Sequence, residues 1–294
     1  MNKIALALGT FDGLHRGHIN VLNKTKELSE YGFTPSVLLF DCHPQKAISR
    51  ISPPLLITNE DKEKFVRELG LLPVPIRFDD IRDLSPEEFI RDILVKKLGA
   101  GAVVSGENFR FGKNGSGDSR ILCTLCEKYG IIYKTAESVM FEGEIISATR
   151  IRSALKNGDI ESANAMLGRN FSYDFIVVEG NKIGKKFFGF PTINQRFPSD
   201  FIDLKHGVYA SQTLVDGELF PSVTNFGSHP TVGETKVQSE TCILGFDGDL
   251  YYRRIRVELL SFLRSEKKFD SVEELKAQID IDSKKAALIF GDNK

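Results

Sequence analysis

The chain has 294 residues, of which 41% are hydrophobic, and its formal net charge is −1. A chain of this length holds one large or two ordinary domains, and its near-neutral charge does not favour nucleic acid or an anionic membrane as the main partner. No apolar run approaches the length of a membrane span, and the start lacks the pattern of a signal peptide, so we expect no membrane partner.

The first expected element is a buried strand over residues 4–8, followed by a helix from about residue 19 to 30. Between them lies the glycine-rich turn GTFDGLHRGH, residues 9–18. Such a turn lets backbone N–H groups at a helix N-terminus approach a phosphate closely. His15 and His18 add two donors near the same end. A single histidine is usually a core or surface residue, but two in H-x-G-H at a strand-to-helix turn indicate an anion site.

The rest of the first half alternates strands and helices. Apolar runs predict strands near 35–40, 74–78, 102–105 and 131–134, with helices near 59–69, 85–98 and 118–129 between them. This alternation is typical of an α/β fold with a doubly wound parallel sheet, in which ligands bind beyond the carboxyl ends of the strands. The segments 9–18, 41–44 and 106–117 all follow strands, as that rule requires. No G-x-G-x-x-G follows a strand, so the dinucleotide-binding fingerprint is absent.

The chain has four cysteines, two of them in a C-x-x-C formed by Cys123 and Cys126. They fall inside the expected helix 118–129, and no second Cys pair or His pair lies nearby. Helix packing is therefore favoured over a redox or zinc role, which stays open. So few cysteines make a disulfide framework improbable, and we expect a cytoplasmic location.

From about Arg169 onward the pattern changes to short alternating runs. They lie near 175–178, 207–214, 222–226, 240–246 and 255–262, and predict a small antiparallel β-barrel. A capping box at Ser271 begins a terminal helix, whose apolar side carries Leu275, Ile279 and Ala286. We therefore expect two domains, 1–168 and 169–294.

The turn at residues 9–18 resembles the adenylyltransferase signature of bacterial bifunctional riboflavin kinase/FAD synthetases. Further family motifs follow in order: F-x-x-H-P at 40–44, L-x-T-x-x-x-K at 56–62, G-x-x-F-x-F-G at 106–112 and I-S-S-T-x-x-R at 146–152. In the last of these, Ala148 stands where the family usually has a second serine. The resemblance implies that the first domain is an FMN adenylyltransferase, a nucleotidyltransferase-like domain.

The resemblance also implies residue roles in the first domain. His15 and His18 would be catalytic. His43 either contacts the triphosphate or holds its loop. Phe109 and Phe111 would face the flat flavin ring with Asn108 at its edge, or they are core anchors of a glycine-rich loop. The implied nucleotide-binding residues are Gly9, Phe11, Asp12, Gly17, His43, Ser147, Thr149 and Arg152.

Residues 180–194, GNKIGKKFFGFPTIN, are similar to a Walker A motif, but they do not match it. The spacing from Gly180 to Gly184 is one residue short, and Lys186 stands where the motif requires Ser or Thr. The stretch instead resembles the riboflavin kinase motif G-F-P-T-x-N. The resemblance assigns Gly180, Gly184 and Lys185 to nucleotide binding, Thr192 and Asn194 to Mg²⁺, Glu240 to the catalytic base and Arg264 to flavin binding. Hydroxyl and amide oxygens are hard ligands that suit Mg²⁺. Lys185 replaces the usual Arg, and the interval between Gly184 and Gly189 is one residue longer than in the family motif.

The resemblance implies that the barrel domain makes FMN and ADP from riboflavin and ATP, and that the first domain makes FAD and pyrophosphate from FMN and ATP. The expected partners are these small molecules, with Mg²⁺ as cofactor and no nucleic acid. Three alternatives stay open. The first is that only one of the two activities is live, because of Ala148 or the Lys185–Phe188 interval. The second is that the chain is a flavin-binding regulator derived from this enzyme. The third is that the transferase acts on another acceptor. The sequence does not predict the oligomeric state.

Overall fold

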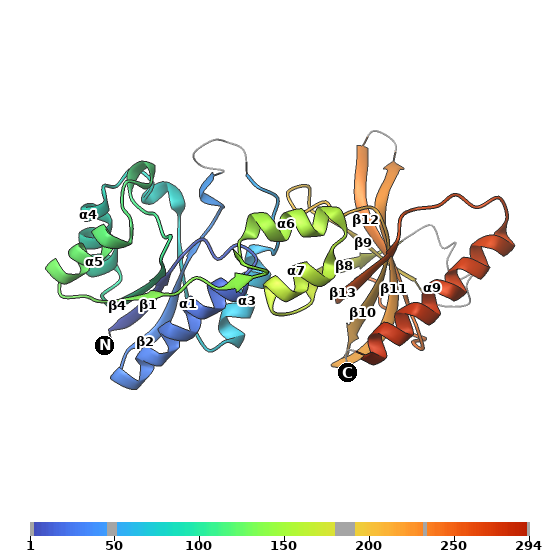
Figure 1. Ribbon diagram of the computed structural model, residues 1–294, viewed down its shortest axis with the longest axis horizontal. Helices are drawn as coiled ribbons and strands as arrows, with labels where there is room; N and C mark the ends of the chain where they lie inside the picture. Colours follow the sequence, from blue (N-terminus) through green and yellow to red (C-terminus); the bar gives the residue numbers. More distant parts are fainter. Residues whose placement is uncertain (1–2, 46–51, 180–191, 232–233, 293–294) are drawn as a thin grey trace. The chain divides into compact units, whose positions relative to one another are not determined.

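The computed structural model describes residues 3–45, 52–179, 192–231 and 234–292. The chain forms two compact units, Met1–Ala148 and Thr149–Lys294, and each is described by itself. Figure 1 shows the first unit in blue to green and the second in yellow-green to red. The domain boundary expected after residue 168 stays a prediction.

A five-stranded parallel sheet forms the centre of the first unit. Its strand order is β3-β2-β1-β4-β5, and every neighbouring pair is parallel, which confirms the doubly wound sheet. Strands β1 and β2 carry nearly continuous apolar runs because helices cover both faces of the sheet. The strands are β1 (Ile4–Leu8), β2 (Thr34–Phe40), β3 (Leu72–Ile76), β4 (Ala100–Gly106) and β5 (Ile132–Ala136).

The two faces of the sheet bury alternate residues of the same strands. Leu6 and Leu8 of β1 belong to one apolar layer with residues of η3 and α5, whereas Ala5 and Ala7 belong to the other with residues of α1 and α3. The helices are α1 (Arg16–Lys26), α3 (Asn59–Glu68), α4 (Pro86–Glu88), the π-helix η3 (Phe89–Lys97), α5 (Ser119–Lys128), and the short 3₁₀ segments η1 (Glu27–Tyr31), η2 (Phe78–Asp80) and η4 (Lys113–Gly115). The two-residue strands β6 (Met140–Phe141) and β7 (Glu144–Ile145) form a short hairpin.

The second unit begins at Thr149, the second residue of α6 (Ala148–Asn157), and continues with α7 (Ile160–Leu167) and a closed barrel. Asn164 of α7 ties this helix to the barrel: its Nδ2 donates to the Leu259 carbonyl at 2.9 Å, and its Oδ1 accepts from the Phe171 amide at 2.7 Å. The barrel order is β10-β11-β12-β9-β8-β13. Its strands are β8 (Phe171–Val178), β9 (Thr192–Arg196), β10 (Gly207–Val215), β11 (Glu218–Thr231), β12 (Glu234–Ile243) and β13 (Arg254–Arg264).

The expected barrel is confirmed, with two local corrections. Strand β9 was not predicted, because its residues were assigned to a phosphate-binding motif. The strand expected over 240–246 ends at Ile243. The chain turns there because Gly245 adopts a left-handed φ of 76° and the Leu244 amide bonds back to the Pro221 carbonyl at 2.9 Å.

The inside of the barrel is partly polar. Gln195 crosses it, donating from Nε2 to the carbonyls of Phe175 and Ile255, both at 2.7 Å. The hydroxyls of Ser211, Thr224 and Thr241 form a buried chain. Because successive side chains alternate between the two faces of a strand, the residues between these inward positions face outward.

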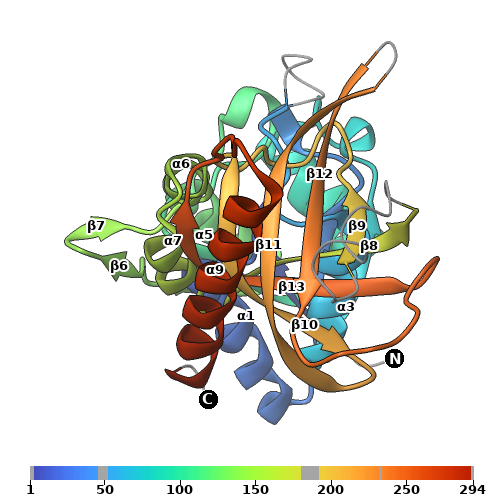
Figure 2. The same ribbon diagram turned by 90° about the vertical axis from the view of Figure 1, so that its right-hand side faces the viewer.

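The terminal helix α9 (Val272–Asp292) packs along the outside of the barrel (Figure 2). Its Ala286 and Phe290 join Val208, Ala210 and Leu260 in one apolar cluster. Of the apolar side expected for the helix, Ala286 is buried in this cluster, whereas Leu275 and Ile279 are half-buried outside it. Within the described ranges, no helix is long and apolar enough to cross a membrane.

Candidate active sites

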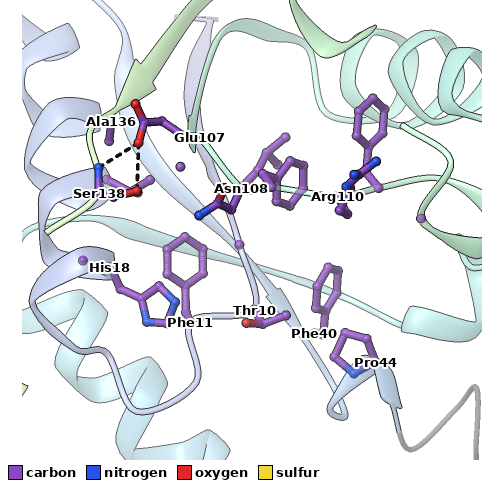
Figure 3. A pocket seen from close by; sticks show the side chains of 18 of the residues that line it. Thr10, Phe11, His18, Phe40, Pro44, Glu107, Asn108, Arg110, Ala136 and Ser138 are labelled. Atoms are coloured by element: carbon purple, nitrogen blue, oxygen red, sulfur yellow. Dashed lines mark hydrogen bonds between the residues drawn. The ribbon is translucent and has the colours of Figure 1, made fainter. Parts of the chain in front are cut away.

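A cavity of about 710 Å³ opens at the carboxyl ends of the parallel strands. The segments that follow β1, β2, β4 and β5 supply its walls, as the position of the motifs predicted (Figure 3). Of the sequence-predicted residues it is lined by Gly9, Phe11, His15, Gly17, His18, Asn108, Phe109 and Phe111.

The two histidines of H-x-G-H meet at the N-terminus of α1. His15 is the N-cap, and its Nδ1 accepts from the His18 amide at 3.4 Å. Their rings stack at 3.7 Å between centroids, and Phe11 packs edge-on against His18 at 5.4 Å. This cap makes the helix begin at Arg16 rather than near Ile19. Two imidazoles and the N-terminus of α1 therefore meet at one cavity, which is an arrangement that stabilises anions.

Two positions of this turn require glycine, because a Cβ atom there would crowd a neighbouring aromatic ring. A Cβ on Gly17 would lie 3.1 Å from the His15 ring, and a Cβ on Gly9 would lie 3.2 Å from the Phe11 ring. The backbone is also strained, since the buried non-glycine residues Phe11 and Leu14 adopt left-handed φ values of 48° and 46°. Backbone strain of this kind concentrates at binding and catalytic turns.

Asp12 and His43 are not among the residues that line the cavity. Asp12 is 5% exposed, and its Oδ2 lies 3.8 Å from Nε2 of His43. The other ring nitrogen of His43 accepts from the Gln45 amide at 3.2 Å. Burial lowers the pKa of the nearby Lys62, an effect that the negative charge of Asp12 opposes. These contacts favour the loop-holding role of His43 over direct contact with a triphosphate.

In the loop after β4, the aromatic residues are both core anchors and part of the cavity wall. Phe111 is buried and packs on Phe89 in the core, and it also stacks parallel to Phe109 at 5.8 Å. Both rings line the cavity together with the exposed Asn108. Phe111 is therefore a core anchor that supports a second aromatic face.

A polar contact closes one wall of the cavity. Oε2 of Glu107 accepts from the amide and the hydroxyl of Ser138, at 3.1 and 2.8 Å (Figure 3). It ties the segment after β4 to the segment after β5. Sequence reasoning missed this contact, because nothing in the two separate stretches pairs them.

The motif at 146–152 spans the division between the two units. Ile145 and Ile146 line the cavity, and Ser147 follows them in the first unit. Thr149 and Arg152 belong to α6 in the second unit, where Arg152 is 9% exposed.

The predicted kinase residues form a row across the barrel. Asn194 of β9 is directly opposite Glu240 of β12, which is opposite Asn225 of β11; the row continues through Val208 of β10 to Arg264 of β13. Residues opposite one another share a face of the sheet. Since the neighbours of Glu240, Ser239 and Thr241, are fully buried inside the barrel, this row lies on its outer face.

The row brings oxygen donors from neighbouring strands together. Thr192 and Asn194 are two residues apart on β9 and share a face, with the carboxylate of Glu240 on the next strand. A hydroxyl, an amide and a carboxylate suit Mg²⁺. Gly180, Gly184 and Lys185 lie outside the described residues.

Arg264 does not face open solvent. Its Nε donates to Oδ2 of Asp282 in α9 at 2.9 Å. Sequence reasoning missed Asp282, although its position gives a signal. Asp282 follows Ile279 by three residues and precedes Ile289 by seven, and this spacing places it on the apolar side of an amphipathic helix. Asn225 was not singled out by sequence reasoning, and its place in the row follows from strand register.

Comparison with known proteins agrees with the division of the chain into two units. A family model described as FAD synthetase matches residues 1–150, and one described as riboflavin kinase matches residues 167–290. The fold and the two sites thus define a two-domain transferase. The chain belongs to the family of bifunctional riboflavin kinase/FMN adenylyltransferases, and it is an enzyme of that type.

Relatives match nearly the whole chain. The bifunctional riboflavin kinase/FMN adenylyltransferase of Bacillus subtilis is 33% identical over 98% of this chain and 93% of its own length. The protein of the same name from Escherichia coli K12 is 35% identical over 97% of this chain and 92% of its own. A solved structure titled as a macrolide-efflux protein of Streptococcus pneumoniae has a TM-score of 0.86 at 24% identity, over 96% of this chain and 93% of that one, which shows a shared fold.

Proposed function

We propose that the cavity of the first unit makes FAD from FMN and ATP, and that the outer face of the barrel makes FMN from riboflavin and ATP. The observation that carries the first assignment is the stacked pair His15 and His18 at the N-terminus of α1, facing the cavity. The observation that supports the second is the row of Asn194, Glu240 and Asn225.

In the first reaction, a phosphate oxygen of FMN attacks the α-phosphorus of ATP, and the bond to the bridging oxygen of the β-phosphate breaks to release pyrophosphate. His15, His18 and the helix amides stabilise the charge that develops on the transferring group and on pyrophosphate. The aromatic face of Phe109, supported by Phe111, lies beside the flavin ring. Gly9, Phe11 and Gly17, which line the cavity, would contact the nucleotide.

In the second reaction, Glu240 accepts the proton of the 5′-hydroxyl of the ribityl chain while that oxygen attacks the γ-phosphorus of ATP and ADP leaves. Thr192 and Asn194 would hold Mg²⁺, which neutralises phosphate charge when bound. The three oxygen donors on two adjacent strands support this assignment. Gly180, Gly184 and Lys185 would contact the nucleotide. A cytoplasmic location stays a prediction.

One incubation tests the whole scheme: the purified chain with riboflavin, ATP and Mg²⁺, with the flavins separated over time. FMN should rise first and then pass to FAD. FMN accumulating without FAD would leave a kinase alone. If riboflavin is unchanged, FAD formed from supplied FMN would leave an adenylyltransferase alone, and no product from either flavin would favour a flavin-binding regulator.

Two substitutions separate the sites. His18→Ala should abolish FAD formation from FMN and spare FMN formation, whereas Glu240→Ala should do the reverse. Glu218→Ala, at the exposed start of β11, is the matched control for removal of a barrel carboxylate and should leave both rates unchanged. Loss of both activities in His18→Ala would contradict two separate sites. An unchanged kinase rate in Glu240→Ala would exclude Glu240 as the base.

A further inference from the structure

The carboxylate of Asp282 is the most deeply buried charge of the terminal helix. The residue is 1% exposed and lies one turn from Ala286, which packs on the barrel. A buried carboxylate is costly unless each oxygen is compensated. Both are: Oδ2 accepts from Nε of Arg264 at 2.9 Å, and Oδ1 accepts from Nε2 of Gln278 at 3.0 Å.

Docking of α9 does not require this ion pair. Val208, Ala210 and Leu260 of the barrel already bury Ala286 and Phe290. Apolar residues in place of a buried ion pair usually give equal or greater stability. Anchoring α9 to the barrel therefore does not explain the Arg264–Asp282 ion pair, which indicates a second role.

Arg264 organises the segment that follows β13. While its Nε is held by Asp282, its Nη1 donates to the Ser265 carbonyl at 3.2 Å, and its guanidinium lies 5.7 Å from the centre of the Phe269 ring. One side chain thus contacts the first and the fifth residue after the strand. Asp282 fixes that side chain from the helix side.

The organised segment lies on the face that carries the kinase row. The carboxylate of Glu266 sits directly over Gly227, where an added Cβ would overlap Oε1 and lie 3.4 Å from Cδ. Gly227 is two residues from Asn225 on β11, so both point to the same face, and Asn225 is opposite Glu240. The segment 265–270 therefore borders the row from the side of β11.

We propose that Asp282 is a positioning residue for riboflavin phosphorylation: it orients Arg264, and through it the segment 265–270, as one wall of the kinase site. This inference rests on the proposed location of the kinase site. The consequence is that the terminal helix, which has no residue in the row, controls how riboflavin is held there.

The test is steady-state kinetics of the full chain carrying Asp282→Asn, which keeps the shape and removes the charge. We expect the KM for riboflavin to rise roughly ten- to hundredfold, by analogy with the loss found when a residue that orients a metal ligand is replaced. The KM for ATP should change little, and FAD formation from supplied FMN should be unaffected. The control is Asp280→Asn on the same helix, whose 63% exposed side chain pairs with Lys284; it should match the wild type.

A second variant separates positioning from stability. Arg264→Met/Asp282→Leu replaces the pair by apolar residues and should unfold no more readily than the wild type, yet its KM for riboflavin should stay raised. Normal riboflavin kinetics in Asp282→Asn, or in the stable double variant, would overturn the inference while leaving the proposed function intact. An inactive wild-type kinase assayed in parallel would instead refute the proposed function and this inference with it.

Discussion

A methyl group added at Gly117 should impair FAD formation through the ring of Phe111. A Cβ at this position would lie 2.6, 2.8 and 2.8 Å from Cε1, Cδ1 and Cζ of that ring. The glycine cannot move away, because its amide and carbonyl both bond to the backbone of Phe111, at 2.9 and 3.1 Å. The relief must come from the ring, which stacks on Phe109 at the cavity wall.

The size of the effect follows from the overlap. Carbon atoms pack best at about 3.5–4.0 Å, so the Phe111 ring must shift by about 1 Å. Overpacking of this size costs about 1–3 kcal/mol. If the displaced Phe109 face loses that amount of interaction with the flavin ring, the KM for FMN in adenylyl transfer should rise roughly 5- to 150-fold.

The assay is FAD formation at varied FMN for Gly117→Ala, with FMN formation from riboflavin as the internal control, which should not change. A double-mutant cycle with Phe111→Leu tests the cause, since the smaller side chain leaves room for the methyl group. Gly117→Ala should then add little to the effect of Phe111→Leu alone. Equal, additive effects in the two backgrounds would refute the steric reasoning.

Three further predictions concern reactivity and stability. Burial raises the pKa of Cys126 to about 12, so iodoacetamide at pH 8 should modify the exposed Cys123 and spare Cys126, and rapid labelling of both, seen by mass spectrometry, would contradict this. Gly112→Ala, with φ at 72° and a proline ring 2.9 Å from the new Cβ, should lower the free energy of unfolding in urea by about 2 kcal/mol, whereas Gly291→Ala, with open space, should not. Burial raises the pKa of Tyr173 to about 12, above its ordinary value near 10, so the stability that this residue contributes is complete below pH 10 and is lost as the pH rises towards 12. Tyr173→Phe should flatten that part of the stability profile, and an identical slope in both proteins would exclude Tyr173 as its source.

The sequence predicted the parallel sheet and its binding edge well, because both follow from local patterns. An apolar run such as 4–8, followed by a glycine-rich turn and a helix, leaves few other folds. The sequence did not predict that His15 would cap α1, since histidine is not a usual capping residue. It also left two roles for His43, and the contact with Asp12 that favours one of them joins loops 31 residues apart in the chain.

The row of Asn194, Glu240 and Asn225 on the barrel could not be predicted from sequence patterns. A period of two tells which face of a strand a residue occupies, but it does not tell which residue of another strand is opposite it. Glu240 was identified by resemblance, yet its neighbours Asn194 and Asn225 became a group only through the register of β9, β11 and β12.

Asp282 lies between these two cases. The spacing from Ile279 to Ala286 places it on the apolar side of the terminal helix, so its burial could be predicted from local pattern. A buried carboxylate then requires a partner, and the requirement is physical rather than statistical. Which cation fills it depends on how the barrel closes, since β10 pairs with both β11 and β13 and so brings Arg264 beside the helix. An acidic residue on the apolar side of a helix is therefore a signal that a partner exists, and only the closed barrel shows that the partner stands at the edge of the kinase row.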